Sequence, residues 1–218
     1  MSAERLEQLK ARAARLKAEA QRREDYQAII RLQRAYGFYI DKGYWREASN
    51  LFAEDATFEQ GVDGVYVGRE RIHQLIVKLT GGNPGPGLPF GQLNERFQLQ
   101  PVITIADDGL SAKGRWHELS MLGQYGEHAE WGEGVYENTY RKEDGVWKIA
   151  SLHYFPNFVA PYEGGWASLK PVEGDWRSPE LADFPPDAPP TVTYKPFPDQ
   201  FIPPFHYPHP VTGKEIAQ

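Results

Sequence analysis

The sequence predicts an α+β protein in which helices pack on one face of an antiparallel sheet. Residues 3–79 hold segments whose apolar residues recur at helical spacing, whereas residues 97–155 alternate with a period of two. After Phe155 the composition changes again, because 14 of the 18 prolines lie between Pro156 and Pro210. Helices followed by strands are typical of an α+β fold rather than of alternating βαβ units.

The helical part is predicted to begin with one long helix, or two abutting helices, over residues 3–41, which are rich in good helix formers. Its first half carries a narrow apolar stripe that could pack on a neighbouring subunit: Leu6, Leu9, Ala13, Leu16 and Ala20. After about Tyr26 the apolar face broadens. Gly43 interrupts the pattern, and a second short helix is expected around residues 45–52.

Residues 53–60 are expected to be extended, residues 61–68 to form a glycine-bearing turn, and residues 69–79 to form a third helix. The segment GGNPGPGLP breaks both helix and strand and is predicted to be a loop beside a pocket mouth. Four strands joined by turns such as ADDG and KEDG follow at Phe97–Ala106, Leu110–Tyr125, His128–Lys142 and Val146–Phe155.

Three regions are therefore expected: a helical arm over residues 1–25, an α+β domain over residues 26–166 and a C-terminal arm over residues 167–218. The last region is rich in aromatic residues as well as proline, unlike an ordinary solvated linker. We expect it to dock on the domain or on a neighbouring subunit, with a disordered tail as the alternative.

Composition excludes several classes of function. The 218-residue chain has a net charge of −6 from interspersed acids and bases, so it offers no basic stripe for nucleic acid. The absence of cysteine excludes disulfides and thiolate chemistry. Because the N-terminus lacks the apolar run of a signal peptide and no long apolar segment exists, a cytoplasmic protein without membrane contact is predicted.

Four motifs resemble, in order and spacing, the SnoaL-like family of the nuclear-transport-factor-2-like superfamily: ASNLFAEDATFEQ, VYVGRERI, PVITIADDGLSAKGRWHEL and GVYENTYRKEDGVWKIASLHYFPNFVAPYEGGW. The resemblance covers roughly residues 26–166. It implies a strongly curved sheet wrapped around helices as a conical barrel with a deep pocket for a small, aromatic molecule. Members of the family include cyclases, dehydratases, isomerases and binding proteins, so the resemblance leaves function open.

The resemblance also implies candidate pocket residues. Related dehydratases place Tyr and Asp five residues apart on the first domain helix, as in Tyr36 and Asp41, with Tyr39 between them. Both reach one pocket only if the helix ends near Asp41, since five residues turn it by about 500°; otherwise they are core and cap residues. Where those dehydratases carry His, this chain has Arg96, which cannot be a base but can bind an oxyanion.

Strand alternation adds further candidates. His153 shares a face with Trp147 and Ile149, which predicts a titratable imidazole in the pocket, or else a buried hydrogen-bonded one. On the two preceding strands, Trp116 shares a face with Glu118, and Asn138 shares a face with Tyr140. The small residues Ala112 and Gly114 should leave room beside Trp116. If Glu118 faces the pocket, desolvation makes it a usable base. The alternative is that Glu118 faces solvent or an interface.

A subgroup of the family removes formaldehyde from the γ-carbinol of lignin-derived diaryl compounds and leaves a stilbene. The chain resembles it in its long N-terminal helix, its proline-rich tail and the missing His. A cofactor-independent carbon–carbon lyase is therefore predicted, with Tyr36, Asp41, Arg96, Glu118 and His153 as catalytic residues and Tyr39, Trp116, Asn138 and Tyr140 binding substrate. The alternatives are a dehydratase or isomerase using Asp41 with His153, and a non-catalytic module. No metal is predicted, no nucleotide motif occurs, and a homo-oligomer, dimer or trimer, is expected.

Overall fold

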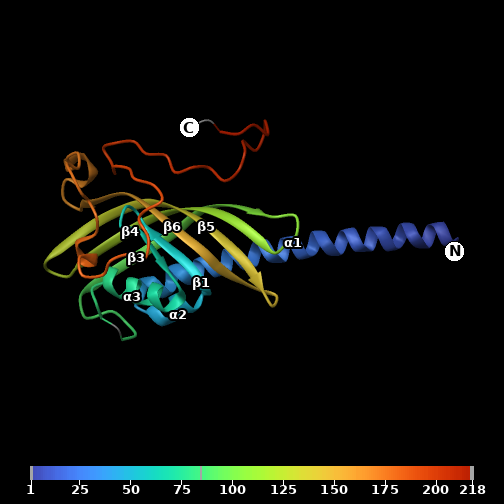
Figure 1. Cartoon of the computed structure of the whole chain (residues 1–218), viewed down its shortest axis with the longest axis horizontal. Helices are drawn as coiled ribbons and strands as arrows, with labels where there is room; N and C mark the ends of the chain where they lie inside the picture. The colour runs from blue at the N-terminus through green and yellow to red at the C-terminus, as the bar shows by residue number, and fades with distance from the viewer. Residues whose placement is uncertain (1, 84, 217–218) are drawn as a thin grey trace.

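A computed structural model of the chain describes residues 2–83 and 85–216 (Figure 1). The long helix α1 (Ala3–Asp41) is followed by α2 (Trp45–Asn50), β1 (Phe52–Gln60), β2 (Val65–Val67) and α3 (Arg69–Leu79). Strands β3 (Gln92–Ile105), β4 (Ser111–Gln124), β5 (His128–Glu143) and β6 (Val146–Pro161) come next. Two short 3-10 turns, at Gly165–Ser168 and Pro179–Leu181, lie in the C-terminal arm. The predicted α+β class is confirmed.

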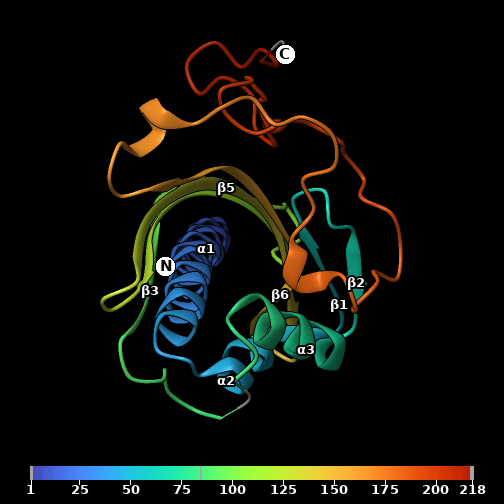
Figure 2. The same ribbon diagram turned by 90° about the vertical axis from the view of Figure 1, so that its left-hand side faces the viewer.

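The six strands form one sheet in the order β2-β1-β6-β5-β4-β3. Neighbours are antiparallel except β1 and β6, which run parallel, so the sheet is not purely antiparallel as expected. Figure 2 looks along α1 and shows the long strands curving around its C-terminal half. The ends of the sheet, β2 and β3, are not joined, and the expected barrel is therefore an open, curved sheet.

Helix α1 has two unlike halves. Ser2 caps its start by accepting a hydrogen bond from the Arg5 backbone N–H at 3.2 Å. Residues 2–24 are all exposed, and the buried face begins at Asp25, which contacts Lys142 and the Trp147 indole N–H. The first half therefore projects from the body as a stalk, and the second half fills the concave side of the sheet (Figures 1 and 2).

The helix ends where the sequence predicted. Gly43 has a positive φ of 74°, and an added Cβ would lie 2.7 Å from the Gly87 backbone, which only glycine avoids. The glycine- and proline-rich loop thus rests on the turn between α1 and α2 through Gly87 N–H to Gly43 C=O at 3.2 Å. The loop expected over residues 61–68 contains one short strand, β2, that alternation over three residues could not predict.

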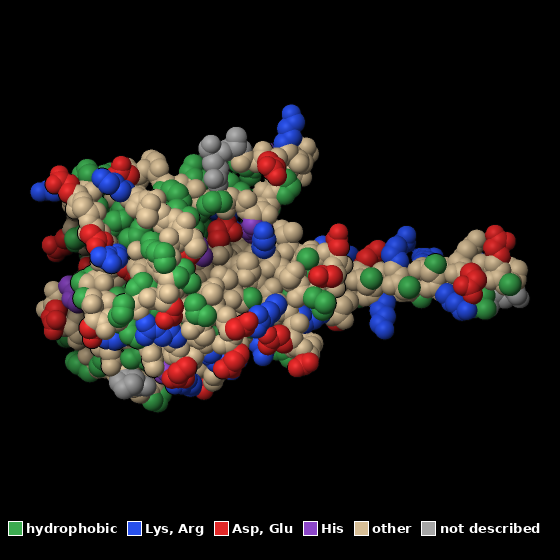
Figure 3. Space-filling view, viewed as in Figure 1, with side chains coloured by type: hydrophobic (Ala, Val, Ile, Leu, Met, Phe, Trp, Pro, Cys, Tyr) green, Lys and Arg blue, Asp and Glu red, His purple; other side chains and the backbone are tan. Residues whose placement is uncertain are grey.

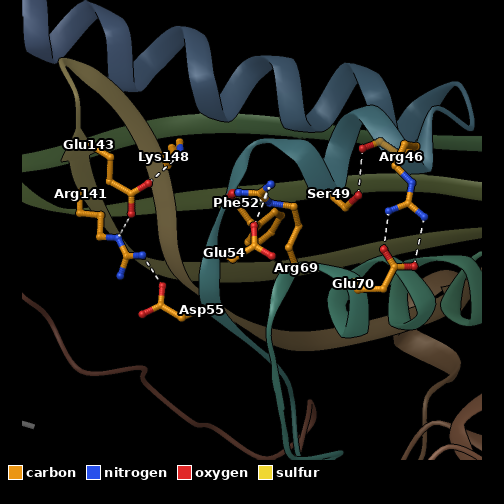
Figure 4. Close-up of polar contacts among 10 residues, drawn as sticks. All are labelled: Arg46, Ser49, Phe52, Glu54, Asp55, Arg69, Glu70, Arg141, Glu143 and Lys148. Carbon is orange, nitrogen blue, oxygen red and sulfur yellow. Dashed lines mark hydrogen bonds and ion pairs between the residues drawn. The ribbon is translucent and has the colours of Figure 1, made fainter.

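Ion pairs join the helices to the sheet beside this turn (Figure 4). Arg46 of α2 makes two hydrogen bonds to Glu70 of α3, at 2.6 and 3.2 Å. Arg69 donates from Nε to the Phe52 carbonyl at 3.0 Å and pairs with Glu54 at 3.1 Å. These contacts fix α2 and α3 across β1, so that the two helices close one end of the concave side.

The C-terminal arm packs on the outer face of the sheet, as Figures 1 and 2 show. The Thr191 backbone N–H donates to the buried Glu59 carboxylate at 2.6 Å, and Ser178 does the same to Asp63 at 2.6 Å. The Tyr66 ring stacks on Phe184 at a centroid distance of 5.4 Å. The arm is therefore docked on its own domain; docking across a subunit interface stays a prediction.

Candidate functional site

A small cavity of about 80 Å³ lies between the second half of α1, α3 and the concave face of the sheet. Its wall carries a band of polar side chains among apolar ones: Tyr36, Ile40, Phe58, Gln60, Ile76, Leu79, Thr80, Arg96, Tyr136 and Tyr154. Each layer of the fold contributes, because α1, β1, α3, β3, β5 and β6 all place at least one residue there. The cavity is therefore the point at which the curved sheet and its helices converge.

The polar side of this cavity is organised by Glu118, whose side chain is fully buried. Glu118 Oε1 accepts from Arg96 Nη1 at 2.9 Å and from the Tyr154 hydroxyl at 3.0 Å. Its Oε2 accepts from the Tyr136 hydroxyl. Three donors from three different strands thus hold one carboxylate, which confirms the expectation that Glu118 faces inward.

Arg96 is positioned by both its backbone and its side chain. Its backbone N–H donates to Asp41 Oδ1 at 2.6 Å, and its Nε donates to Asn94 Oδ1 at 3.1 Å. Nη1 binds Glu118, whereas Nη2 has no partner within residues 2–83 and 85–216. Because Arg96 lines the cavity, this nitrogen is available to an oxygen of a bound molecule.

Burial sets the ionisation of the cluster. Desolvation is the largest cause that raises the pKa of Tyr36, Tyr136 and Tyr154, and the Glu118 carboxylate adds to it in each case. Burial lowers the pKa of Arg96, but the Glu118 carboxylate and the nearby tyrosines raise it by more. The pKa of Arg96 therefore lies above its usual value. The phenols therefore remain protonated donors, and the guanidinium remains a fixed cation.

Tyr36 is the one phenol of the three without a partner for its hydroxyl among the described residues. Its ring is 4 % exposed and packs edge-on against Phe52 and Tyr136, at centroid distances of 5.9 and 6.4 Å. The hydroxyl is not among the fully buried polar atoms that lack a partner, so it is reached from the cavity that Tyr36 lines. The Tyr36 hydroxyl is therefore a donor free to bind a molecule in the cavity.

Asp41 lies on the other side of Arg96, in a separate recess of about 290 Å³ lined also by Phe38, Phe97 and Leu99. Helix α1 does end at Asp41, but the rotation between it and Tyr36 still directs the two side chains into different recesses, both of which Arg96 borders. Burial raises the pKa of Asp41 to about 6. The structure therefore does not bring Asp41 into the cavity of Tyr36.

Trp116, Asn138 and Tyr140 form a second polar network deeper under the sheet. The Trp116 indole N–H donates to the Tyr140 hydroxyl at 2.9 Å, and that hydroxyl donates to Gln33 Oε1 at 2.8 Å. Asn138 also donates to Gln33, at 3.0 Å. The room expected beside Gly114 is filled, because an added Cβ would lie 3.0 Å from the Tyr140 ring. These residues therefore support the core and do not line the cavity.

The placement of His153 is a correction. Thr139 pairs with Ser151 and Tyr140 with Ile149, so that Ala150 is skipped in a bulge and the alternation of β6 reverses. Leu152 and Tyr154 consequently face inward, and His153 faces outward beneath the C-terminal arm. Its Nδ1 lies 3.4 Å from Glu59 Oε2, and burial lowers its pKa to about 4.

The structure thus brings together three of the nine predicted positions: Tyr36 and Arg96 line one cavity, and Glu118 lies directly behind its wall, bound to Arg96. Tyr39 is half-buried against the core and does not line it. Sequence reasoning missed Tyr154, because its strand was read without a bulge, and also Tyr136, which lies two residues before Asn138 on the same strand. It also missed Gln33, whose only signal was its position three residues before Tyr36 on the buried face of α1.

Within the described residues no three His, Cys, Asp or Glu side chains are grouped so that they could hold a metal ion. No described helix is both long and apolar enough to cross a membrane. The ionisable side chains at and directly behind the cavity wall are a carboxylate, three phenols and a guanidinium.

The sequence profile of the SnoaL-like domain matches residues 21–153, more than half of the chain. The protein therefore belongs to the SnoaL-like family. No curated protein sequence matches it significantly.

Solved structures agree on the fold. A Novosphingobium aromaticivorans protein provisionally named a scytalone dehydratase shares 19% identity, covers 66% of this chain and 91% of its own, and superposes with a TM-score of 0.57. Hexachlorocyclohexane dehydrochlorinase LinA-type3 from Novosphingobium barchaimii shares 19% identity over 72% of this chain and 99% of its own, with a TM-score of 0.56. ActVI-ORFA from Streptomyces coelicolor shares 13% identity over 61% and 96%, with a TM-score of 0.51. Likeness at these identities shows the fold alone.

Proposed function

We propose that the protein is a cofactor-independent lyase that eliminates formaldehyde from the γ-carbinol of a lignin-derived diaryl compound. The observation that carries the proposal is the buried Glu118 carboxylate, which is held by three residues of the cavity wall, Arg96, Tyr136 and Tyr154. Such a cluster combines an acceptor for one proton with donors for a departing oxygen, which is what an elimination needs.

The proposed step is balanced without an added oxidant or reductant. Glu118 takes the γ-hydroxyl proton through the Tyr154 hydroxyl, which passes its own proton on across the 3.0 Å hydrogen bond. The γ-carbon leaves as formaldehyde, and the electrons of the broken carbon–carbon bond form the α,β double bond. The α-oxygen departs as water, stabilised by Arg96 Nη2 and protonated by the Tyr36 hydroxyl. A diaryl diol therefore gives a stilbene, formaldehyde and water.

Two further observations support an elimination. The names of two structural relatives, a dehydrochlorinase and a dehydratase, describe eliminations of a small leaving group on the same fold. The apolar wall around Phe58, Ile76 and Leu79 also suits aromatic rings. The cavity of about 80 Å³ is nevertheless smaller than the roughly 300–1,000 Å³ of common ligand pockets, so a diaryl compound requires side chains at the mouth to move.

That small volume favours a second candidate, the dehydration of a compact cyclic hydroxy compound by the same cluster. Asp41 and His153 would not form its proton pair, because Asp41 lies in a separate recess and His153 faces the outer side of the sheet. Arg96, Tyr36 and Glu118 would instead act as they do in the first candidate. The two reactions differ in one product, formaldehyde.

The test incubates the purified protein with lignin-type diaryl diols and with cyclic hydroxy ketones, and follows formaldehyde and ultraviolet absorbance. Formaldehyde with stilbene absorbance supports the first candidate, and absorbance change alone supports the second. The matched pair of variants is Glu118→Gln against Glu137→Gln, since Glu137 makes the same kind of pair with Arg115, at 2.7 Å, on the outer face. Equal activity in both variants, or no turnover by the parent, would contradict an enzyme that uses this cavity.

A further inference from the structure

Asn94 is a buried amide that joins helix α1 to the guanidinium of Arg96. It is 4% exposed and lies on β3 two residues before Arg96, so the two side chains share a face of the strand. Its Nδ2 donates to the Ile40 carbonyl at 2.9 Å, and its Oδ1 accepts from Arg96 Nε at 3.1 Å. The side chain therefore connects the end of α1, at Asp41, with the cavity that Arg96 lines.

These two contacts make opposite demands, which one primary amide meets. The Ile40 carbonyl can only accept a hydrogen bond, and the Arg96 Nε–H can only donate one. A flipped Asn94 amide would bring its N–H groups against the Arg96 N–H and its oxygen against the Ile40 carbonyl. The contacts therefore hold the amide in a single orientation, with the oxygen towards Arg96.

The guanidinium of Arg96 is in turn held at two of its three nitrogens. Nε donates to Asn94, and Nη1 donates to Glu118 at 2.9 Å. Because the guanidinium is planar and rigid, two held nitrogens set the direction of the third. Contact with Glu118 alone would leave the plane free to turn about that one hydrogen bond. Asn94 is therefore the contact that determines where Nη2 points.

The outer pair of Arg115 and Glu137 is oriented in another way. Arg115 reaches Glu137 and the Pro203 carbonyl through Nη1, at 2.7 and 3.2 Å, and its Nε has no partner among residues 2–83 and 85–216. Its guanidinium instead lies over the Phe205 ring, whose centroid is 4.2 Å from Arg115 Cζ. The hydrogen bond to Nε thus belongs to the pair whose guanidinium lines the cavity.

We propose that Asn94 is a positioning residue, which fixes the plane of the Arg96 guanidinium and keeps Nη2 directed into the cavity. Its catalytic consequence rests on the proposed function, in which Nη2 stabilises the departing oxygen. A donor that is oriented beforehand meets the developing charge without reorganisation in each turnover. Asn94 acts through Arg96 and takes no part in the proton transfers.

The first experiment follows the Arg96 Nε–H signal by heteronuclear NMR and needs no activity. Figure 3 shows Lys and Arg side chains spread over the surface of one face, where solvent exchanges such protons quickly; the Arg96 signal is the slowly exchanging one that Arg96→Lys lacks. In Asn94→Ala its exchange should become roughly tenfold faster or more, the effect of losing one hydrogen bond to a charged group. Asn94→Asp keeps an acceptor for Nε and should keep the slow signal. Unchanged exchange in Asn94→Ala, or fast exchange in Asn94→Asp, would overturn the proposal.

The matched control is Gln98→Ala, two residues after Arg96 on the same strand. Gln98 also makes two hydrogen bonds, from its Nε2 to the Arg96 carbonyl at 3.2 Å and from Gln33 to its Oε1 at 2.8 Å, and neither involves the guanidinium. Both alanine variants should lower the melting temperature, but Gln98→Ala should leave the Arg96 Nε–H signal slow. Fast exchange in Gln98→Ala as well would show a general loosening of β3 and would refute a positioning role for Asn94.

The second experiment measures steady-state kinetics with the diaryl diol. Asn94→Ala should lower kcat by roughly 10- to 100-fold, the cost of a misplaced group. KM should change little, because the interaction with the departing oxygen develops in the transition state. Gln98→Ala should keep kcat near that of the parent. If the parent shows no turnover, the proposed function fails and the NMR comparison alone decides the role of Asn94; if the parent is active and Asn94→Ala keeps its kcat, the positioning role is wrong.

Discussion

At the scale of single residues, the sheet holds two arginine–glutamate pairs of the same kind in opposite settings. Arg96 and Glu118 join β3 to β4 on the concave face, where a cavity lies against them. Arg115 and Glu137 join β4 to β5 on the outer face, where the Pro203 carbonyl accepts from Arg115 at 3.2 Å. Arg96 of the first pair lines the cavity that Tyr36 also lines, whereas Glu137 of the second pair borders a recess of about 340 Å³ beneath the C-terminal arm.

Arg96→Ala is expected to lower turnover by about two to three orders of magnitude, the roughly 3–4 kcal/mol scale of losing a preorganised oxyanion donor. It should also lower the free energy of unfolding by about 3–5 kcal/mol, because Glu118 is left buried without its cation. Arg96→Lys should restore activity only in part, since a point charge lacks the planar fork. Steady-state kinetics and urea unfolding measure both effects. Arg115→Ala is the control, and near-normal turnover in Arg96→Ala would remove the role assigned to Arg96.

Asp41 should make stability depend on pH. Burial raises its pKa to about 6, above the ~3.9 of an unfolded chain. The protonated form thus stabilises the fold below about pH 4, and this contribution is lost as the pH rises through 6. Asp41→Asn keeps an oxygen that can accept the Arg96 N–H, so it should gain stability relative to the parent between pH 4 and 7. Urea unfolding at several pH values measures the difference, and a constant difference would contradict the raised pKa.

How far the sequence could predict the site also depends on single residues. Arg96 and Glu118 were predictable, because one occupies the family's His position and the other lies on a regularly alternating strand. Tyr154 was not, since the bulge at Ala150 exchanges the two faces of β6, and no local residue type signals it. The sequence therefore predicted His153 on the inward face of β6, whereas the structure places Tyr154 there.

At the scale of elements, the strands were predictable to within a few residues, except that β3 begins at Gln92 and β6 ends at Pro161. Both extensions lie beyond the regular alternation, where pairing to the neighbouring strands β4 and β5 continues the sheet. The helices matched because their apolar spacing is strong. The parallel contact of β1 with β6 was not predictable, since it joins segments about 90 residues apart through tertiary packing alone.

Gly134, two residues before Tyr136 on β5, gives a prediction at the scale of one strand. A Cβ added at Gly134 would lie 2.6 Å from the Tyr154 ring, so Gly134→Ala should push that phenol away from Glu118. We expect a stability loss of about 1–3 kcal/mol, typical of overpacking, together with a fall in turnover of at least tenfold. Gly132→Ala is the control on the same face, because its Cβ would meet the Ser120 side chain instead. Equal turnover losses in both variants would argue against a relay through Tyr154.

At the scale of the whole molecule, two arms extend from one curved domain, and they differ in whether they pack against it. The stalk is exposed along its full length, whereas the C-terminal arm is fixed to the outer face by carboxylates and aromatic rings. Buried Glu59 and Asp63 receive their hydrogen bonds from the arm, so removing it leaves two carboxylates without these donors. The arm is thus part of what stabilises the domain.

Deleting residues 170–218 is therefore expected to destabilise the protein. The deletion removes Leu181 and Phe184, whose burial contributes roughly 1.5–3 kcal/mol each, and exposes the Tyr66 ring on which Phe184 stacks. Thermal and urea unfolding should show a loss of several kcal/mol. Deleting only residues 211–218 is the control, because Val211 is 86% exposed and should cost little. If the longer deletion left the melting temperature and the urea midpoint unchanged, the docking of the arm would contribute nothing to the fold, contrary to the contacts of Glu59 and Asp63.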